Sequence, residues 1–532
     1  MGKKNTDTDT DTDTDTDTHT HSHTDTNAYN CSNCTDLMIS KKNIKTSLEL
    51  ESISIQNPKL INSNGNYLVK SNLFGVYTKN INVKNSKYIY APITTYGSNI
   101  FNNVNVLKYG SDGCLYIGGT YNNIAGMDIC WGISKWDGKK ITKLGSGLIG
   151  GQVWALEFDS SGNLYAGGEF ISSGKSIVNY IAKYNKVTDS WDSIQNGNQV
   201  GLNTFIYALI YSASTNRLYI GGPNGLITLS SCFCYLDLVT DTFNNIASTS
   251  ITSNFLSGTI RTFAFDRANT DTIPKLYFGG SFNFTLSSST TTYSNIGLIE
   301  DKLSPYSFLP SYTATSVSWA STGGTIFSLL STNTKLYVGG LYQLTTPITP
   351  PNYQINNLSI LDNLLFSPIS TKTIGGIQYP LVPNNTVNTI GMDSLSNLYI
   401  GGVFTAISYK TFSTSPFINT IAANKYGIFN PITSIWSSDT YFNSTVNSIV
   451  FNNKKPSPSK SDIVIGGSFS TSEQFVSGVT IYTNNYINMV VDNKIMYTLT
   501  SLGSSVTISS HKNACGTNGF VYATLNYENF NN

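Results

Sequence analysis

Short apolar runs alternate with polar, turn-forming runs along most of the chain, and one pair of runs keeps returning. Its core is the pattern Leu-Tyr-x-Gly-Gly, which is clearest at residues 164–168. The first glycines of successive copies stand at positions 118, 167, 221, 279, 339, 401 and 466, with spacings that grow from 49 to 65 residues. Self-similarity at such a period indicates a protein built from repeated structural units.

The copy at residues 153–194 shows what one unit contains. Residues 153–158 form an apolar run that predicts a first strand, and residues 159–163 have turn chemistry. The second strand is expected at 164–168, a third at 180–184 and a fourth at 190–194. A sheet of four short antiparallel strands that is apolar on both faces needs a neighbour on each face. The pattern therefore predicts the blade of a β-propeller.

The predicted first strand recurs before every Gly-Gly strand, at 104–109, 206–211, 260–265, 326–330, 387–392 and 446–451. The two glycines have no Cβ, so we expect them where the next blade approaches closely, as for Gly167 and Gly168. The tyrosine before them should pack its ring between blades while its hydroxyl reaches a polar partner. Its copies are Tyr116, Tyr165, Tyr219, Tyr277, Tyr337 and Tyr399, with Val464 in the seventh unit.

The order of these elements resembles kelch-type repeats. The third strand ends in Tyr or Trp and a further Trp follows, as at Trp136 and at Tyr184 with Trp191. A Gly-Gly-x-Phe variant of the repeat is more similar still, because Asn-x-Ile-Ala follows the glycines at residues 179–182. The resemblance covers roughly residues 70 to 527 and implies a propeller fold. It says little about function, since propellers of this type host binding, scaffolding and several enzymes.

The two ends of the repeat region read as halves of one blade. Residues 72–77 predict a third strand and 87–91 a fourth, whereas 505–509 predict a first strand and 519–525 a second. We therefore predict an all-β fold of eight four-stranded antiparallel blades, with one blade split between the termini. Seven blades with extra terminal strands is the alternative. Residues 66–532 would form this single propeller, closed by pairing of its terminal strands, after a tail and linker at 1–65.

Residues 6–26 alternate Thr with Asp and then with His, which leaves nothing to bury, so we expect a disordered tail. The chain has no run of 18 apolar residues and no apolar stretch behind Lys3 and Lys4. We therefore expect no membrane insertion and no secretory signal. Only 12% of residues are charged, the net charge is +1, and no basic cluster occurs, so no nucleic-acid partner is expected.

Possible metal ligands are few. His19, His21 and His23 precede Cys31 and Cys34, and imidazole and thiolate are the usual ligands of divalent transition metals. A simple-sequence tract that drifted from Thr-Asp to Thr-His explains the same spacing. No second Cys-x-x-Cys completes a zinc site. We predict neither a metal site nor a cofactor.

Seven cysteines cannot all pair with one another, which with the missing signal sequence favours a reducing compartment. Cys232 and Cys234 alternate along a strand-like run, so we expect buried thiols in the core.

Two enzyme classes that occur on β-propellers fit the sequence poorly. A copper radical oxidase needs two histidines, and the body of the chain offers His511 alone. A sialidase needs three arginines that converge on the ring centre. The chain has three, Arg217, Arg261 and Arg267, but Arg261 and Arg267 fall on one strand and its adjoining turn.

A glycosidase that uses two carboxylates is the remaining enzyme reading. Glu157 and Glu169 are its candidates, and both also read as solvated charges on a strand and a loop. Two carboxylates about 5 to 10 Å apart beside an aromatic side chain in the central channel would favour a carbohydrate-active hydrolase. A channel wall of Ser, Thr, Asn and apolar residues would favour a binding protein.

We predict no enzyme and assign no catalytic, cofactor-binding or metal-binding residue. The expected function is a structural or interaction scaffold that binds protein or glycan through loops rich in Ser, Thr, Asn and Tyr. Composition and tail resemble uncharacterised proteins of amoeba-infecting giant DNA viruses. That resemblance implies a virion component or a protein of the host cytoplasm. The alternative function is a carbohydrate-active hydrolase that uses the central channel.

Overall fold

The computed structural model describes residues 103–470 apart from short gaps at 122–129, 138–140, 228–231, 247–256, 268–270, 287–291, 304–305, 313–317, 320–323, 347–352, 411–415, 439–441 and 453–461. Outside this part it describes the backbone of short strands between residues 49 and 92 and between 477 and 527. The described residues form an all-β structure. None of them belongs to a helix that could cross a membrane.

Seven antiparallel sheets of the repeat follow one another through the described residues. Listed from first to fourth strand, they are β8 (Asn103–Tyr109), β9 (Leu115–Thr120), β10 (Ile133–Trp136) and β11 (Ile141–Lys143); β12 (Val153–Phe158), β13 (Leu164–Gly168), β16 (Ile181–Asn185) and β17 (Ser190–Ser193); β20 (Ala208–Ser212), β21 (Arg217–Gly221), β22 (Phe233–Asp237) and β23 (Thr242–Asn245); β24 (Ser257–Phe265), β25 (Lys275–Thr285), β26 (Thr292–Glu300) and β27 (Phe308–Leu309); β29 (Thr325–Ser331), β30 (Leu336–Thr346), β31 (Tyr353–Asp362) and β32 (Leu365–Ser367), with β28 (Ser318–Trp319) added to β30; β36 (Val387–Met392), β37 (Leu398–Gly402), β40 (Tyr426–Asn430) and β41 (Ile435–Ser437); and β42 (Val446–Asn452), β43 (Asp462–Ser470), β44 (Ser477–Thr483) and β7 (Ile89–Pro92).

The remaining strands lie in the connections or at the termini. The connections contain β14 (Ser172–Ser173) with β15 (Ser176–Ile177), β18 (Gln195–Asn196) with β19 (Gln199–Val200), β33 (Thr371–Ile374) with β34 (Ile377–Pro380), and β35 (Val382–Pro383), β38 (Ala406–Tyr409) and β39 (Ile418–Ala422). The termini contain β2 (Ile61–Ser63), β3 (Asn66–Leu68) and β6 (Ile81–Asn82), then β4 (Lys70–Ser71) with β5 (Val76–Tyr77), and a five-stranded sheet of β1 (Glu49–Leu50), β47 (Leu502–Ser510), β48 (Val521–Tyr527), β46 (Ile495–Thr500) and β45 (Tyr486–Val491).

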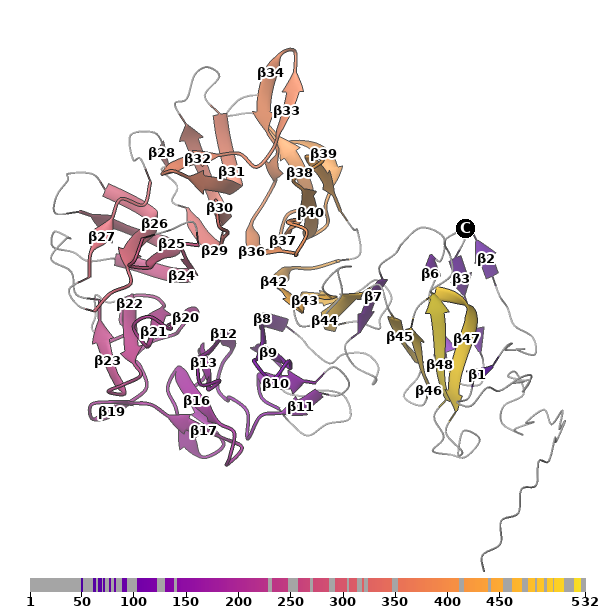
Figure 1. Cartoon of the computed structure of the whole chain (residues 1–532), viewed down its shortest axis with the longest axis horizontal. Coiled ribbons are helices and arrows are strands. Elements are labelled where there is room, and N and C mark those ends of the chain that lie inside the picture. Colours follow the sequence, from indigo (N-terminus) through magenta and orange to yellow (C-terminus); the bar gives the residue numbers. More distant parts are fainter. Residues whose placement is uncertain are drawn as a thin grey trace, which may run out of the picture.

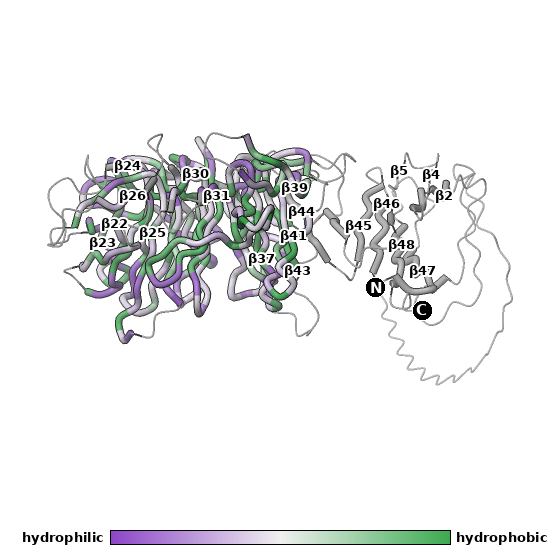
Figure 2. The backbone as a smooth tube through the Cα atoms, turned by 90° about the horizontal axis from the view of Figure 1, so that it is seen from above, coloured by the Kyte–Doolittle hydropathy of each residue, from purple (hydrophilic) through white to green (hydrophobic). Residues whose placement is uncertain are grey.

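The seven sheets have a propeller-like arrangement. Their first strands β8, β12, β20, β24, β29, β36 and β42 face a common centre, and the later strands of each sheet lie progressively further out (Figure 1). Seen from the edge, the sheets lie in one layer, and hydrophobic and hydrophilic segments alternate along the chain (Figure 2). The first and second strands predicted from the repeat are confirmed. Among the first strands, β12 and β36 have the predicted bounds, and each of the others lies within three residues of its predicted bounds at either end.

The first glycine of each pair faces the next sheet. A Cβ added to Gly167 would lie 2.6 Å from Cγ2 of Ile206, which precedes β20. The same contact recurs between Gly118 and Val153, Gly221 and Ile260, Gly279 and Ile326, Gly339 and Val387, Gly401 and Val446, and Gly466 and Val104. The last of these joins the seventh sheet to the first. A β-branched side chain therefore fills the space above each of these glycines, as the close approach of neighbouring sheets requires.

The second glycine has a different neighbour from the one predicted. A Cβ on Gly168 would lie 2.0 Å from the carbonyl oxygen of Gln152, in the same sheet, and not against the next one. The prediction that both glycines face the next blade was therefore wrong for the second. The register shift between Val153 and Ala155 explains this, because the extra residue bends the first strand toward its partner.

The terminal strands pair only in part as predicted, since 505–509 in β47 pairs with 521–525 in β48 as expected but the N-terminal strands have other partners. β5 pairs with β4 and β48 pairs with β47 and β46, so the expected pairing of 72–77 with 520–525 is wrong for the described residues of those segments. Instead, β7 pairs with β44, with Tyr90 opposite Tyr482. An N-terminal strand thus completes the seventh sheet, which unlike the others takes its fourth strand from a distant part of the chain among the strands described.

The repeated tyrosine behaves as predicted in four sheets, where its ring is buried and its hydroxyl reaches a carboxylate. Tyr116 bonds Asp112 at 2.9 Å, Tyr165 bonds Asp159 at 3.4 Å, Tyr219 bonds Asp301 at 2.7 Å and Tyr399 bonds Asp393 at 3.0 Å. Asp159 and Asp393 also accept the backbone and side-chain N–H groups of Asn163 and Asn397. The turn before the second strand is therefore fastened to the strand itself.

The thiols of Cys232 and Cys234 are fully buried, as predicted. Burial raises the pKa of the Cys232 thiol to about 12 and raises that of Cys234 as well. Both stay protonated at neutral pH and act as core side chains.

A candidate ligand site at the centre of the sheets

One side chain from each first strand, or from the residue just before it, points into a shared central cavity. These are Asn105, Trp154, Tyr207, Arg261, Phe327, Asn388 and Asn447, which we call the ring residues. Each follows directly after the β-branched residue that covers a glycine. Together with Asn103, Thr445 and Ser468 they line a cavity of about 390 Å³, within the range of about 300 to 1,000 Å³ typical of ligand pockets.

A backbone irregularity aims these side chains. Six of the seven ring residues are the extra residue at a register shift between the first and second strands, for example Trp154 between Val153 and Ala155. The seventh, Tyr207, lies just before β20. A β-bulge turns the side chain of its extra residue out of the regular alternation, so a residue that would otherwise pack between sheets faces the centre.

Three asparagines of the ring fasten neighbouring sheets to one another. The Nδ2 of Asn105 donates to the carbonyl of Val153 at 3.2 Å, and that of Asn447 donates to the carbonyl of Val104 at 3.0 Å. The Nδ2 of Asn388 reaches the carbonyl of Val446 at 3.5 Å. Each asparagine thus donates to the first strand of the following sheet, and the bond from Asn447 joins the seventh sheet to the first.

The same amides form a continuous chain of side-chain hydrogen bonds. Asn388 donates to Asn447 at 3.1 Å, Asn447 to Asn103 at 2.9 Å, and Asn103 to Asn105 at 2.8 Å. Asn105 then donates to Gln152 at 3.2 Å. Most of the polar groups on this side of the cavity are therefore already bonded within the protein, which favours a structural role for them.

The opposite side of the cavity is aromatic and carries one positive charge. The guanidinium of Arg261 lies 4.2 Å from the ring centroid of Tyr207 and 5.3 Å from that of Phe327. Trp154 meets Tyr207 edge to face, with centroids 5.8 Å apart. Cation–π attraction holds the guanidinium between the two rings.

Unused hydrogen-bonding capacity of the ring residues lies on this side and at Asn388, the asparagine that follows Phe327 in the ring. Among the described residues, the guanidinium of Arg261 has no hydrogen bond or ion pair, the hydroxyl of Tyr207 neither donates nor accepts one, and the Oδ1 of Asn388 accepts none. All three residues are half-buried. Polar groups that are preorganised and unpaired in a cavity are what a ligand site requires.

The cavity wall contains no carboxylate among its described residues. Glu169 is half-buried and accepts hydrogen bonds from Trp154 Nε1 at 3.2 Å and from Gln152 Nε2 at 3.4 Å. Glu157 is 8% exposed and pairs with Lys108 at 2.8 Å across two sheets. The interpretation of Glu157 as a solvated strand charge was therefore wrong, because this glutamate is an inter-sheet ion pair.

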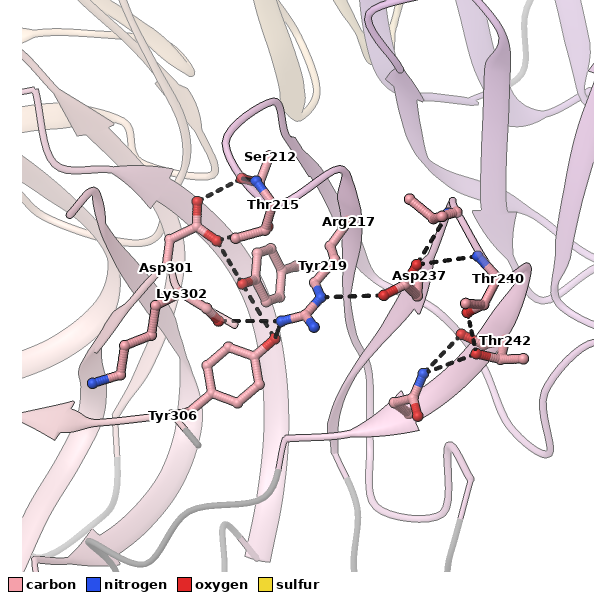
Figure 3. A network of polar contacts seen from close by, with 12 residues as sticks. Ser212, Thr215, Arg217, Tyr219, Asp237, Thr240, Thr242, Asp301, Lys302 and Tyr306 are labelled. Atoms are coloured by element: carbon pink, nitrogen blue, oxygen red, sulfur yellow. Dashed lines mark hydrogen bonds and ion pairs between the residues drawn. The ribbon is translucent and has the colours of Figure 1, made fainter. Parts of the chain in front are cut away.

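The other two arginines do not approach the cavity. Arg267 is exposed. Arg217 is 5% exposed, and Figure 3 shows it between Asp237, at 3.6 Å, and Tyr306, whose hydroxyl it contacts at 2.6 Å. Its guanidinium also covers the ring of Tyr235 at 4.3 Å. Arg217 is therefore matched within the core, and the three arginines do not converge.

Asp301 is the centre of this buried network. Asp301 is 2% exposed, and its carboxylate accepts hydrogen bonds from Ser212, Thr215 and Tyr219 (Figure 3). It also accepts one from Ser214, which lies with Thr215 in the turn between β20 and β21 of the third sheet. Burial, with Tyr306 and Asp301 close by, raises the pKa of Tyr219, so it stays a hydrogen-bond donor. Because Asp301 follows the third strand of the fourth sheet, the network locks two neighbouring sheets together.

The part of the chain that the structure describes contains no group of three or more His, Cys, Asp or Glu side chains that could hold a metal ion. His19, His21, His23, Cys31 and Cys34 lie outside it, as does His511.

A second cavity of about 500 Å³ lies between the fourth and fifth sheets, with Asp266, Asp271, Lys275, Lys335 and Asp362 on its wall. Its charges are of both signs, and Lys275 pairs with Asp271 at 2.6 Å. We therefore regard the central cavity as the better candidate.

Sequence reasoning considered Arg261 and missed the other ring residues, because the ring residues share no chemistry. Asparagine, tryptophan, tyrosine, arginine and phenylalanine occupy equivalent positions. The available signal was positional, since each follows the first β-branched residue of a predicted first strand.

No protein family and no curated protein matches the chain. Among solved structures it is similar to PorZ, a surface component of the type-IX secretion system of Porphyromonas gingivalis, at 12% identity and a TM-score of 0.40, over 78% of this chain and 49% of that one. It is also similar to the extracellular domain of BT3049 from B. thetaiotaomicron, at 14% identity and a TM-score of 0.30, over 77% and 53%. The chain spans about half the length of these structures. Likeness at this level gives no information about the ligand.

Proposed function

We propose that the seven sheets are the blades of a closed seven-bladed propeller. The contact between the first glycine of one sheet and the β-branched residue of the next occurs seven times, and Gly466 with Val104 closes the set. The hydrogen bond from Asn447 to Val104 repeats the bond from Asn105 to Val153 across the same junction. An eighth blade between the first and seventh sheets would interrupt both contacts. Seven blades therefore replace eight as our preferred count.

We further propose that the protein is a non-enzymatic binding protein whose central cavity holds one sugar residue of a glycan. The carrying observation is the arc from Trp154 through Tyr207 and Arg261 to Phe327, which combines aromatic surface with unpaired hydrogen-bonding groups. Aromatic rings cover the apolar C–H faces of sugars, and planar amides and guanidinium groups bond their hydroxyls. A glycan thus matches both the aromatic surface and the hydrogen-bonding groups of the arc, whereas a purely apolar ligand matches the aromatic surface alone.

The hydrolase alternative requires two carboxylates facing the cleaved bond. The described wall of the cavity has none, and Glu169 is engaged by Trp154. This arrangement favours binding over hydrolysis. A place in a virion or in host cytoplasm stays a prediction from composition and tail alone.

Binding of the full-length chain to a panel of immobilised glycans tests the proposal. Trp154→Ala should weaken binding of any glycan retained by the wild type about tenfold, equivalent to about 1.4 kcal/mol. Tyr379→Ala is the matched control, because Tyr379 is an aromatic residue of the β33–β34 hairpin outside the cavity. Equal losses in the two variants, or no glycan retained by the wild type, would contradict the proposal.

A further inference from the structure

We infer that Arg261 makes the central cavity selective for sugars that carry a carboxylate, such as uronic or sialic acids. This inference rests on the proposed glycan-binding function and goes one step further, to the class of sugar.

The surroundings of Arg261 leave its charge without a counter-ion. Among the described residues lining the cavity, Arg261 is the one ionisable side chain with a permanent charge, and no carboxylate accompanies it. Arg217 provides the contrast, because its guanidinium meets Asp237 and the hydroxyl of Tyr306. A half-buried cation without a counter-ion is costly, and a bound anion lowers that cost.

The geometry of Arg261 suits a carboxylate, which has two acceptor oxygens, better than a ligand that offers a single acceptor atom. Tyr207 and Phe327 flank the guanidinium at 4.2 and 5.3 Å, so its faces are covered and its N–H edges remain for a ligand. A guanidinium presents paired N–H donors that match the two oxygens of a carboxylate. Because the aromatic contacts already fix the side chain, little further ordering is needed on binding.

Neighbouring groups indicate that the anion belongs to a larger polar molecule. The unpaired Oδ1 of Asn388 is an acceptor for a ligand hydroxyl, and the hydroxyl of Tyr207 can donate or accept. A free inorganic anion would use Arg261 but would leave Asn388 and the aromatic surface of Trp154 without a ligand contact. A sugar acid brings a carboxylate, hydroxyls and C–H faces together on one ring.

The experiment is equilibrium binding of the full-length protein to three acid and neutral sugar pairs, with phosphate as a separate probe. Methyl galacturonide is compared with methyl galactoside, methyl glucuronide with methyl glucoside, and N-acetylneuraminic acid with N-acetylmannosamine. We expect at least one acid to bind about tenfold or more tightly than its neutral counterpart. Arg261→Gln should abolish this preference, because it should weaken binding of the acid by about tenfold more than binding of the neutral sugar. Arg267→Gln, which changes an exposed arginine, should keep the preference.

The outcomes separate the two proposals. If acid and neutral sugars bind equally well, the selectivity of Arg261 is contradicted and the glycan site stands. If no sugar binds, both proposals fail. If phosphate binds as tightly as the best acid, the cavity is a simple anion site, which contradicts the sugar acid. Unchanged melting temperatures of both arginine variants would show that altered binding is not due to unfolding. A preference retained in Arg261→Gln would also overturn the inference.

Discussion

The two glycines of each repeat meet different atoms, and this difference has measurable consequences. A Cβ on Gly167 would press on the side chain of Ile206 at 2.6 Å, whereas one on Gly168 would press on the backbone oxygen of Gln152 at 2.0 Å. A side chain can shift its rotamer, but a carbonyl held in a sheet cannot move without disturbing its hydrogen bonds.

We therefore predict that Gly168→Ala destabilises the protein by about 2 to 4 kcal/mol and Gly167→Ala by roughly 1 kcal/mol. Urea unfolding of the two variants beside the wild type measures the difference. An equal or reversed order would show that the next sheet, and not the bulged first strand, sets the requirement for glycine.

The buried carboxylate of Asp301 has a larger structural role than exposed acids of the same sheet. Replacing it with alanine would leave the hydroxyls of Ser212, Thr215 and Tyr219 without their acceptor in the interior. We expect Asp301→Ala to cost roughly 2 to 4 kcal/mol. Asp271→Ala is the control, since Asp271 is 58% exposed and its ion pair with Lys275 should contribute less than about 1 kcal/mol. Similar midpoints for the two variants would contradict this role of the network.

At the scale of elements, the repeat predicted most of the fold from local chemistry. Apolar runs before each Leu-Tyr-x-Gly-Gly motif became the first strands, and the turn at 159–163 lies where Asp159 and Asn163 indicated it. The bulges could not be read in this way, because they arise from how a first strand fits the glycine strand beside it. Without them, Trp154 and Arg261 appear as ordinary strand residues.

The terminal strands were predicted only in part: β47 pairs with β48 and β7 is a fourth strand, but the sheet that β7 joins was mispredicted. Residues 87–91 were recognised as strand-like, but strand-like character does not identify a partner. The choice depends on which sheet would otherwise lack a strand, and that is the seventh, where the edge of β44 is filled by β7. Pairing was therefore decided by the architecture and not by the local sequence.

Engineered disulfides test this pairing. Tyr90 lies opposite Tyr482, and directly opposed residues of antiparallel strands have Cα atoms about 4.5 to 5.5 Å apart, within the range that a disulfide spans. The double variant Tyr90→Cys with Tyr482→Cys should crosslink under mild oxidation. Tyr77→Cys with Tyr522→Cys tests the pairing expected from sequence and should not crosslink. Digestion followed by mass spectrometry identifies the bond, and the reverse result would contradict the assignment of β7.

At the scale of the whole molecule, the ring residues serve both the contacts between neighbouring sheets and the candidate site. The asparagine amides of the sixth, seventh and first sheets bond each sheet to its neighbour across the wall of the cavity. The second to fifth sheets contribute Trp154, Tyr207, Arg261 and Phe327 there instead. The ring thus divides into a side that holds the sheets together and a side with groups left for a ligand.

The most direct test of this account is an experimental structure of the full-length chain with the sugar acid that binds it most tightly. We predict that the first and seventh sheets contact each other through Gly466 and Val104. We also predict that the sugar lies in the central cavity with its carboxylate on Arg261 and its ring against the aromatic side chains. A sugar bound elsewhere, a carboxylate of the protein itself on Arg261, or a further sheet between the first and the seventh would contradict it.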